Sequence, residues 1–302
     1  MRQRKSVSSF FNKEADLKQA IKRKLIQAAA FGFGNAHLPN FISGKLYRGK
    51  GKYLCAPGLN CYSCPAASFA CPIGAMQAAA GDRRFSIGFY ALGTVLAFGV
   101  IFGRAVCGFL CPFGLLQELL YKLPLPKRRL PKILSFIKFI ILAVFVLLLP
   151  AIPGAGGIGS PAFCKYICPA GTLEGGLPAL LTQPAVRKAL GFLFTWKMLL
   201  LLVTAALSIF FHRFFCRVLC PLGAIYGLCN KVSLYRLKVD AESCISCGRC
   251  ASVCLMEADP VSNPDAIECI RCGACAEACP KGAIQIGFYS GKGRAEKVSF
   301  RR

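Results

Sequence analysis

Long apolar runs separated by short basic stretches make up the first three quarters of the chain. Four of these runs approach the length of about 20 apolar residues that a helix needs to cross a bilayer. They cover residues 25–44, 85–103, 133–152 and 189–211. The pattern predicts an α-helical multi-pass membrane domain over residues 25–236 with four spans, preceded by a basic segment at 1–24.

The predicted membrane domain contains an internal repeat. The tetrapeptide Cys-Pro-x-Gly occurs four times, beginning at Cys71, Cys111, Cys168 and Cys220. Each half of the domain therefore has the order span, outer Cys-Pro motif, span, inner Cys-Pro motif. Repeats in membrane proteins commonly place a shared site where the repeats meet. We expect two pseudo-repeated halves with cysteine sites between them.

The more polar C-terminal part carries eight cysteines at a regular spacing. The spacing C-x2-C-x2-C-x3-C occurs twice, which is the pattern of bacterial two-cluster ferredoxins. In that pattern three close thiolates hold one cluster and the fourth cysteine of the run reaches the other cluster. We therefore assign two sets of ligands: Cys244, Cys247, Cys250 and Cys279 for one [4Fe–4S] cluster, and Cys269, Cys272, Cys275 and Cys254 for the other.

This register predicts an α+β ferredoxin-like domain at 237–288, followed by a basic tail at 289–302. Zinc sites also use paired Cys-x2-Cys units. Eight cysteines in this register argue against zinc.

Three further cysteine pairs in the membrane domain share the form C-x3-C-P. They are Cys107/Cys111, Cys164/Cys168 and Cys216/Cys220. Proline suits the first turn of a helix, and a helix N-terminus favours a nearby thiolate. Each pair supplies half of a four-thiolate set, so we expect pairs from the two halves to combine.

The combination predicts one or two further iron–sulfur clusters. Cys107, Cys111, Cys216 and Cys220 form the predicted inner site. Cys64, Cys71, Cys164 and Cys168 form the predicted outer site, with Cys61 as a competitor for Cys64. The alternative for both groups is buried or disulfide-forming cysteine.

The distribution of charge predicts the orientation. The net charge is +25, and basic residues gather before residue 25, at 127–129 and after residue 211. Because Lys and Arg accumulate on the cytoplasmic side, both termini and the ferredoxin-like domain are expected in the cytoplasm. The loop after the first predicted span is also basic, which opposes this pattern. The polar start predicts no cleavable signal peptide, and no nucleic-acid motif is present.

Other redox cofactors lack their signatures. The sequence contains no C-x-x-C-H motif and no glycine-rich nucleotide fingerprint, and its two histidines, His37 and His212, fall at opposite ends of the predicted domain. Neither haem nor direct oxidation of NAD is therefore expected.

The motifs together resemble a known family. The segment Gly-Arg-Ala-Val-Cys-Gly-Phe-Leu-Cys-Pro-Phe-Gly at 103–114, the motif at 216–223 and the double ferredoxin run resemble the NapH/MauN-type membrane ferredoxins. The C-terminal region of NosR and the CcoG-type proteins are similar. The resemblance covers residues 25–285, and the extra outer cysteines at 55–71 and at Cys164/Cys168 depart from the simpler pattern.

The resemblance implies electron transfer between the quinone pool, or a cytoplasmic donor, and a partner redox protein. The predicted function is a membrane electron-transfer protein, such as the electron-transfer subunit of a quinol dehydrogenase. The alternative is a reductase or assembly factor that serves the maturation of another metalloenzyme.

Overall fold

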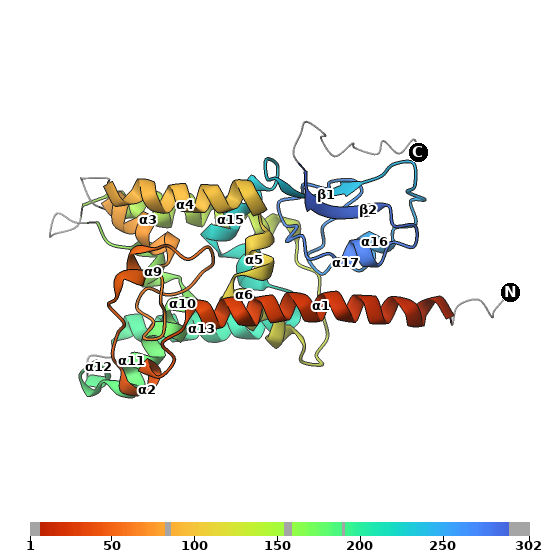
Figure 1. Cartoon of the computed structure of the whole chain (residues 1–302). Helices are drawn as coiled ribbons and strands as arrows, with labels where there is room; N and C mark the ends of the chain where they lie inside the picture. Colours follow the sequence, from red (N-terminus) through yellow and green to blue (C-terminus); the bar gives the residue numbers. More distant parts are fainter. Residues whose placement is uncertain (1–6, 82–85, 154–158, 189–190, 290–302) are drawn as a thin grey trace.

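The computed structural model describes residues 7–81, 86–153, 159–188 and 191–289. The basic tail predicted at 289–302 lies outside these residues apart from its first position, as do the first six residues of the basic N-terminal segment. Figure 1 shows an elongated molecule in which the helices carrying the Cys-Pro motifs lie beside a small α+β domain at one end.

Seven helical elements build the first half of the chain. They are α1 (Val7–Gly34), α2 (Asn40–Ser43), the 3-10 turn η1 (Lys50–Tyr53), α3 (Pro72–Gly81), α4 (Ser86–Phe102), α5 (Ala105–Phe109) and α6 (Pro112–Tyr121). The elements α3, α4, α5 and α6 form the first repeat, because a Cys-Pro helix, an apolar helix and a second Cys-Pro helix follow one another.

The second half begins with one continuous helical stretch from residue 132 to residue 151. It consists of η2 (Lys132–Phe136), α7 (Ile137–Ile141), the π-helical segment η3 (Leu142–Leu148) and α8 (Leu149–Ala151). The second repeat follows: α9 (Ala162–Tyr166), α10 (Pro169–Gly171), the π-helical segment η4 (Thr172–Gly176), α11 (Leu177–Thr182), α12 (Pro184–Lys188), α13 (Phe192–Phe210), α14 (Phe214–Val218) and α15 (Pro221–Cys229).

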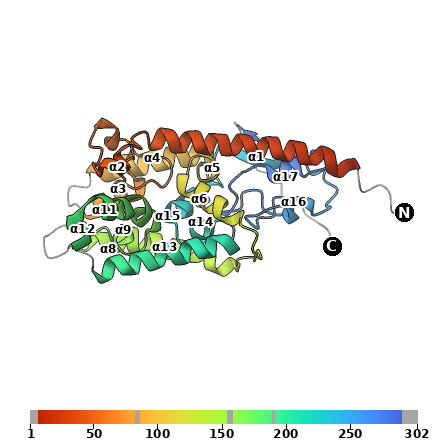
Figure 2. The ribbon, with the colours of Figure 1, turned by 90° about the horizontal axis from the view of Figure 1, so that it is seen from below.

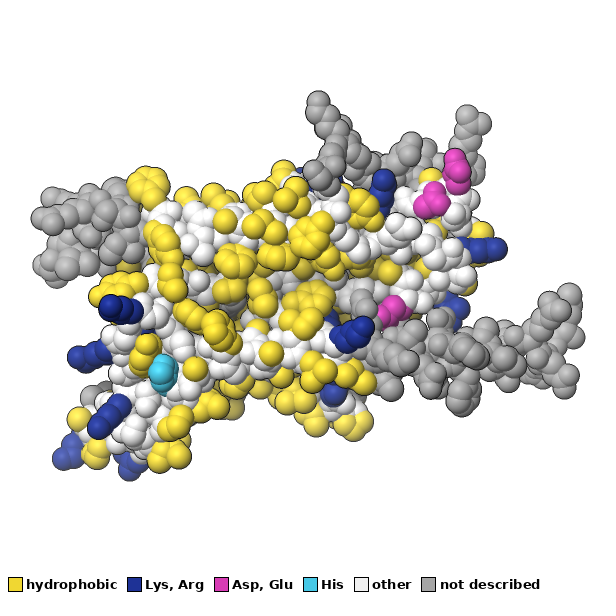
Figure 3. Space-filling model, viewed as in Figure 1, with side chains coloured by type: hydrophobic (Ala, Val, Ile, Leu, Met, Phe, Trp, Pro, Cys, Tyr) yellow, Lys and Arg dark blue, Asp and Glu magenta, His cyan; other side chains and the backbone are white. Residues whose placement is uncertain are grey.

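Two helices among the described residues are long and apolar enough to cross a bilayer. They cover Lys132–Ala151 and Phe192–Phe210, and only 22% and 17% of their most apolar windows are buried inside the protein. The apolar helix α4 occupies most of the second predicted span and is slightly shorter. Figure 3 shows apolar side chains over the middle of one face, with Lys and Arg toward both ends.

The first predicted span does not form one helix, which corrects the expectation for residues 25–44. Helix α1 ends at Gly34, and the chain turns before the short helix α2. Pro39 lacks an N–H group and has a fixed φ angle, so a continuous helix through this position is disfavoured. Four membrane crossings are therefore not established by the fold, and their number stays a prediction.

The cysteine motifs lie in the core between the outer helices. Figure 2 shows α1 and α13 on opposite sides of the molecule, with the Cys-Pro helices between them. One apolar cluster contains Cys71 and Cys168 together with Cys107, Cys111, Cys216 and Cys220. The two predicted membrane sites therefore share a single core.

The C-terminal domain has the α+β composition that the sequence predicts. Strands β1 (Tyr235–Val239) and β2 (Ile284–Phe288) pair antiparallel, with Tyr235 opposite Phe288. The short helices α16 (Arg249–Ser252) and α17 (Ala274–Glu277) lie between the strands in sequence. Because its first and last elements pair, the sheet closes the domain on itself. The domain contacts α4, where the Phe102 and Phe288 rings lie 5.8 Å apart.

Candidate iron–sulfur centres

Two cavities in the C-terminal domain are each lined by four cysteines. Cys244, Cys247, Cys250 and Cys279 line the first cavity, and Cys254, Cys269, Cys272 and Cys275 line the second. These are the two sets that the ferredoxin register predicts. Cys254 and Cys279 each cross to the cavity of the other run, as in two-cluster ferredoxins.

The local backbone explains why each run can surround a cavity. In each run, the residue just before the second cysteine has a positive φ, 54° at Ser246 and 52° at Arg271. The glycines that precede α16 and α17 are also left-handed, with φ of 69° at Gly248 and 93° at Gly273. Left-handed residues turn the chain sharply. The two runs therefore curve around their cavities in the same way.

The thiols of the second cavity are shielded from solvent. Burial raises the pKa of Cys254, and burial likewise raises the pKa of Cys269 to about 11. A cysteine binds iron as a thiolate, so binding here releases protons. Among the described residues, no three His, Cys, Asp or Glu side chains converge on a single metal-ion position.

The inner site brings together the four cysteines that the sequence predicts. Cys107 lies on α5, Cys111 precedes α6, Cys216 lies on α14 and Cys220 precedes α15. All four are buried, and Cys220 is within the range of charge interactions with the other three. Each half of the domain contributes two thiols.

The Cys-Pro motifs act as helix starts in this site. Cys111 and Cys220 are the extended N-cap residues of α6 and α15, and the following prolines occupy the first helical turn. The Gly223 N–H donates a hydrogen bond to the Cys220 Sγ over 3.4 Å. The helix start therefore places N–H donors against the sulfur, as the motif predicts.

Two buried arginines join the halves across the inner site. Arg104 donates from Nη2 to the Cys216 carbonyl over 2.7 Å, and Arg213 donates from Nη1 to the Cys107 carbonyl over 2.5 Å. Each arginine stands three residues before the first cysteine of the C-x3-C-P motif in its own half. Sequence reasoning missed this pair, although the repeated pattern Arg-x-x-Cys-x3-Cys-Pro was visible. The two cations partly balance the charge of four thiolates.

The outer site brings Cys61 together with three of the other predicted cysteines. Cys168 interacts electrostatically with Cys164, Cys61 and Cys71. Cys64 instead packs with Ala66 and Ala67, and its Sγ lies 3.8 Å from the Asn35 Oδ1.

Of the two cysteines that the sequence offers for this position, Cys61 therefore lies with the other three. A carboxylate helps to hold it there. The Cys61 N–H donates to the Glu174 Oε2 over 2.7 Å, which holds this residue against the π-helical segment η4. A basic group also lies at this site, because the Lys197 Nζ donates to the Cys164 carbonyl over 3.1 Å.

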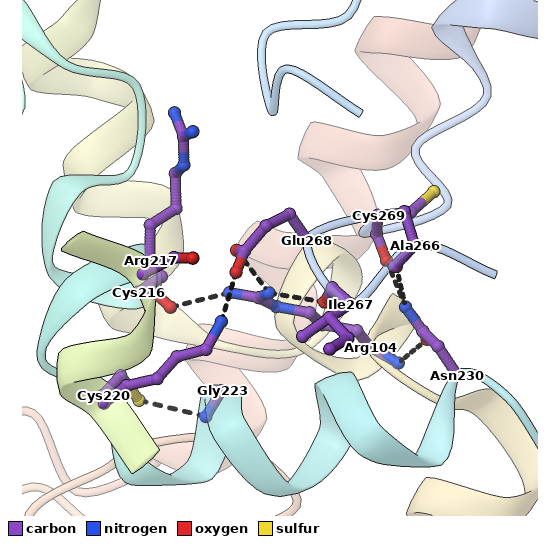
Figure 4. Close-up of polar contacts among 12 residues, drawn as sticks. Arg104, Cys216, Arg217, Cys220, Gly223, Asn230, Ala266, Ile267, Glu268 and Cys269 are labelled. Atoms are coloured by element: carbon purple, nitrogen blue, oxygen red, sulfur yellow. Dashed lines mark hydrogen bonds and ion pairs between the residues drawn. The ribbon is translucent and has the colours of Figure 1, made fainter. Parts of the chain in front are cut away.

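A single asparagine connects the ferredoxin-like domain to the inner site. The Asn230 Nδ2 donates to the carbonyls of Ala266 and Cys269, both over 2.9 Å, and its Oδ1 accepts from the Arg104 N–H over 2.8 Å. Arg104 also donates from Nη1 to the Ile267 carbonyl over 2.6 Å. Figure 4 shows these contacts between the loop of Cys269 and the peptide of Cys216.

Acidic residues of the ferredoxin-like domain meet basic residues of the N-terminal helical part. Glu268 forms ion pairs with Arg104 and Lys138, and Glu257 pairs with Arg217 over 2.9 Å. Burial alone would raise the pKa of Glu257, but the hydrogen bonds from Arg217 and the Leu130 N–H, together with the nearby charges of Arg217 and Arg129, outweigh burial and hold the pKa below its ordinary value. Removing one partner of a buried pair costs roughly 3–5 kcal/mol. These pairs fix the orientation of the domain.

Comparison with known families agrees with this geometry. A family described as a 4Fe-4S binding domain matches residues 68–90, 85–132, 139–179 and 193–240, which together cover slightly more than half of the chain. Each matched segment contains one Cys-Pro-x-Gly motif. A second 4Fe-4S binding domain family matches residues 264–285. The chain therefore belongs to the 4Fe–4S binding family of ferredoxin-type proteins that includes MauN and NosR.

Several curated proteins are similar to the chain. The methylamine utilization ferredoxin-type protein MauN of Methylorubrum extorquens is 30% identical over 53% of this chain and 50% of its own length. The putative electron transport protein YccM of Escherichia coli is 28% identical over 53% of this chain and 43% of its own length.

The regulatory protein NosR of Pseudomonas aeruginosa is 34% identical over 53% of this chain and 21% of its own length. The chain spans between 21% and 63% of the length of the curated relatives that it matches. No solved structure matches the chain.

The glycines of the Cys-Pro motifs provide a matched test of the inner site. A Cβ on Gly223 would lie 2.8 Å from the Cys216 carbonyl oxygen, whereas a Cβ on Gly74 would meet nothing closer than 3.8 Å. We expect Gly223→Ala to displace the carbonyl that Arg104 holds and to lower stability by about 1–3 kcal/mol, with a loss of bound iron. Thermal unfolding and iron content of the purified chain measure both effects.

Gly74→Ala is the control for this comparison. It lies at the same position of an equivalent motif, and Ala is favoured over Gly inside a helix by about 1 kcal/mol. Equal losses of iron in the two variants would contradict the close approach at Gly223.

Proposed function

We propose that this protein is a membrane electron conduit. Its ferredoxin-like domain, at 237–288, holds two [4Fe–4S] clusters on the eight cysteines of the two cavities. The membrane domain, at 25–236, holds an inner cluster on Cys107, Cys111, Cys216 and Cys220, and an outer cluster on Cys61, Cys71, Cys164 and Cys168. When bound, such clusters supply one-electron redox chemistry.

The observation that carries this proposal is the contact through Asn230. Its side chain joins the carbonyl of Cys269, a residue of the second cavity, to the N–H of Arg104. Arg104 in turn holds the carbonyl of Cys216, a residue of the inner site. The protein thus provides a short hydrogen-bonded path from a ferredoxin cavity to the inner cysteines, through the buried side chains of Asn230 and Arg104.

A shared core supports transfer between the inner and outer sites. Leu59, Cys71 and Cys111 belong to one buried apolar cluster, and Gly58 approaches Cys111 so closely that an added Cβ would lie 2.9 Å from the Cys111 Cα. The apolar layer of a membrane is about 30 Å thick, so two centres within one core would cover part of that distance.

The named relatives favour electron transfer over other uses of clusters. YccM is named as a putative electron transport protein and MauN as a ferredoxin-type protein. The partners of this chain are proposed by chemistry alone. A cytoplasmic donor or the quinone pool exchanges electrons at one end of the conduit, and a partner redox protein exchanges them at the other.

The membrane location and orientation are part of the proposal. Two long apolar helices with exposed surfaces, together with α4, support insertion into the cytoplasmic membrane. The basic residues near the N-terminus, at 127–129 and after α13 support a cytoplasmic ferredoxin-like domain.

The orientation is tested by reporters fused to the C-terminus of the full chain. We expect a fluorescent cytoplasmic reporter to be active and a periplasmic phosphatase reporter to be inactive, because Lys and Arg accumulate on the cytoplasmic side. Phosphatase activity outside the cytoplasm would show the opposite orientation.

The inner centre is tested by serine substitutions in both halves. Each half supplies two of the four thiols of the inner site. Cys107→Ser and Cys216→Ser should therefore remove the same EPR signal and reduce the iron content by up to about four atoms per chain. The signals of the ferredoxin-like domain should remain. Cys229→Ser is the matched control, since Cys229 is also a buried cysteine at the end of α15. Iron content that stays equal in all three variants would refute a shared inner cluster.

Serine substitutions at Cys61 and Cys64 test which of the two is a ligand of the proposed outer centre. We expect Cys61→Ser to remove the outer signal because the Cys61 thiol lies among the other three, and we expect Cys64→Ser to leave it in place. Anaerobic purification with iron analysis and EPR distinguishes the two variants. Loss of the signal in Cys64→Ser alone would restore the ligand set that the spacing first indicated.

A further inference from the structure

The inner and outer sites each contain a buried glutamine in the same position. Gln77 on α3 follows Cys71 by six residues, and Gln117 on α6 follows Cys111 by six residues. The exposed fractions of the two side chains are 0% and 1%. A buried amide normally finds hydrogen-bond partners for all its polar atoms. The partners of these two side chains are equivalent.

Each glutamine reaches from the first half of the domain to the second. The Gln77 Oε1 accepts from the Phe163 N–H over 2.9 Å, and the Gln77 Nε2 donates to the Cys164 Sγ over 3.1 Å. The Gln117 Oε1 accepts from the Phe215 N–H over 3.0 Å, and the Gln117 Nε2 donates to the Cys216 Sγ over 3.0 Å.

The nitrogen of each side-chain amide also has a second hydrogen-bond acceptor. The Nε2 of Gln77 lies 3.2 Å from the Ile73 carbonyl, and the Nε2 of Gln117 lies 3.2 Å from the Phe113 carbonyl. A backbone N–H can pair only with the amide oxygen, which fixes the orientation of each amide. The NH2 group must therefore face the cysteine sulfur in both sites.

We propose that Gln77 and Gln117 are positioning residues that set the reduction potentials of the outer and inner centres separately, each through an N–H···S hydrogen bond to a cysteine of the opposite half. The inference rests on the proposed function, because Cys164 and Cys216 must be cluster ligands. Hydrogen bonds to the sulfurs are among the factors that set the potential of a cluster. An N–H directed at sulfur stabilises the reduced, more negative state, so each bond raises the potential of its own centre.

The test is a redox titration of the whole purified chain followed by EPR. Gln117→Leu should lower the midpoint potential of the inner centre, whose EPR signal Cys107→Ser removes. It should leave the outer centre, whose signal Cys61→Ser removes, at its wild-type potential. Gln77→Leu should have the reverse effect. Gln183→Leu is the matched control, because this glutamine is exposed and its side chain donates to the Gly44 carbonyl, away from both sites. It should change neither potential.

The outcomes separate this inference from the proposed function. Unchanged potentials in both leucine variants, at full iron content, would overturn the role of the glutamines. If a leucine variant loses iron, the midpoint potentials of Gln117→Glu and Gln77→Glu decide whether the glutamines set the potential. Their carboxylate can still accept the backbone N–H but removes the donor to sulfur, so a lower potential is expected. Loss of iron in these variants too would show a purely structural role and would also overturn the inference. The proposed inner centre itself fails only if Cys107→Ser leaves every signal in place.

Discussion

The exchange of hydrogen bonds between the two repeats is the interaction on which the rest of the structure depends. Arg104 of the first repeat holds the Cys216 carbonyl, and Arg213 of the second holds the Cys107 carbonyl. Both guanidinium groups are fully buried, so each needs these partners and its carboxylate, Glu268 or Glu118. The same contacts that satisfy two buried charges bring four thiols together. The contacts that pack the two halves together are thus the same contacts that form the inner site.

This arrangement also explains why the ferredoxin-like domain has a fixed place. Glu268, the carboxylate partner of Arg104, belongs to that domain and pairs with Lys138 as well. Asn230 adds hydrogen bonds from the end of α15 to the Ala266 and Cys269 carbonyls. Removing the domain would leave Arg104 and Lys138 buried without an opposite charge. The proposed redox path and the stability of the membrane domain consequently rest on the same few residues.

The sequence predicted well whatever depends on local spacing. The curvature of the ferredoxin runs and the helix starts at Pro112 and Pro221 follow from short-range patterns. Spacing could not predict contacts between distant segments. One such contact bears on the choice between Cys61 and Cys64, because the Cys61 N–H binds Glu174, which lies more than a hundred residues away. The predicted span at 25–44 was wrong as a single helix, because apolar composition does not reveal the end of α1 at Gly34 and the turn around Pro39.

The division of ligands between repeats has a consequence for biosynthesis. On the proposed assignment, the last ligand of the outer centre is Cys168, that of the inner centre is Cys220, and that of the ferredoxin-like domain is Cys279. Neither membrane centre can be completed from the first repeat alone. As the ribosome proceeds, the chain acquires complete ligand sets in the same order in which they lie along the molecule, from the end distant from the ferredoxin-like domain toward it (Figure 1).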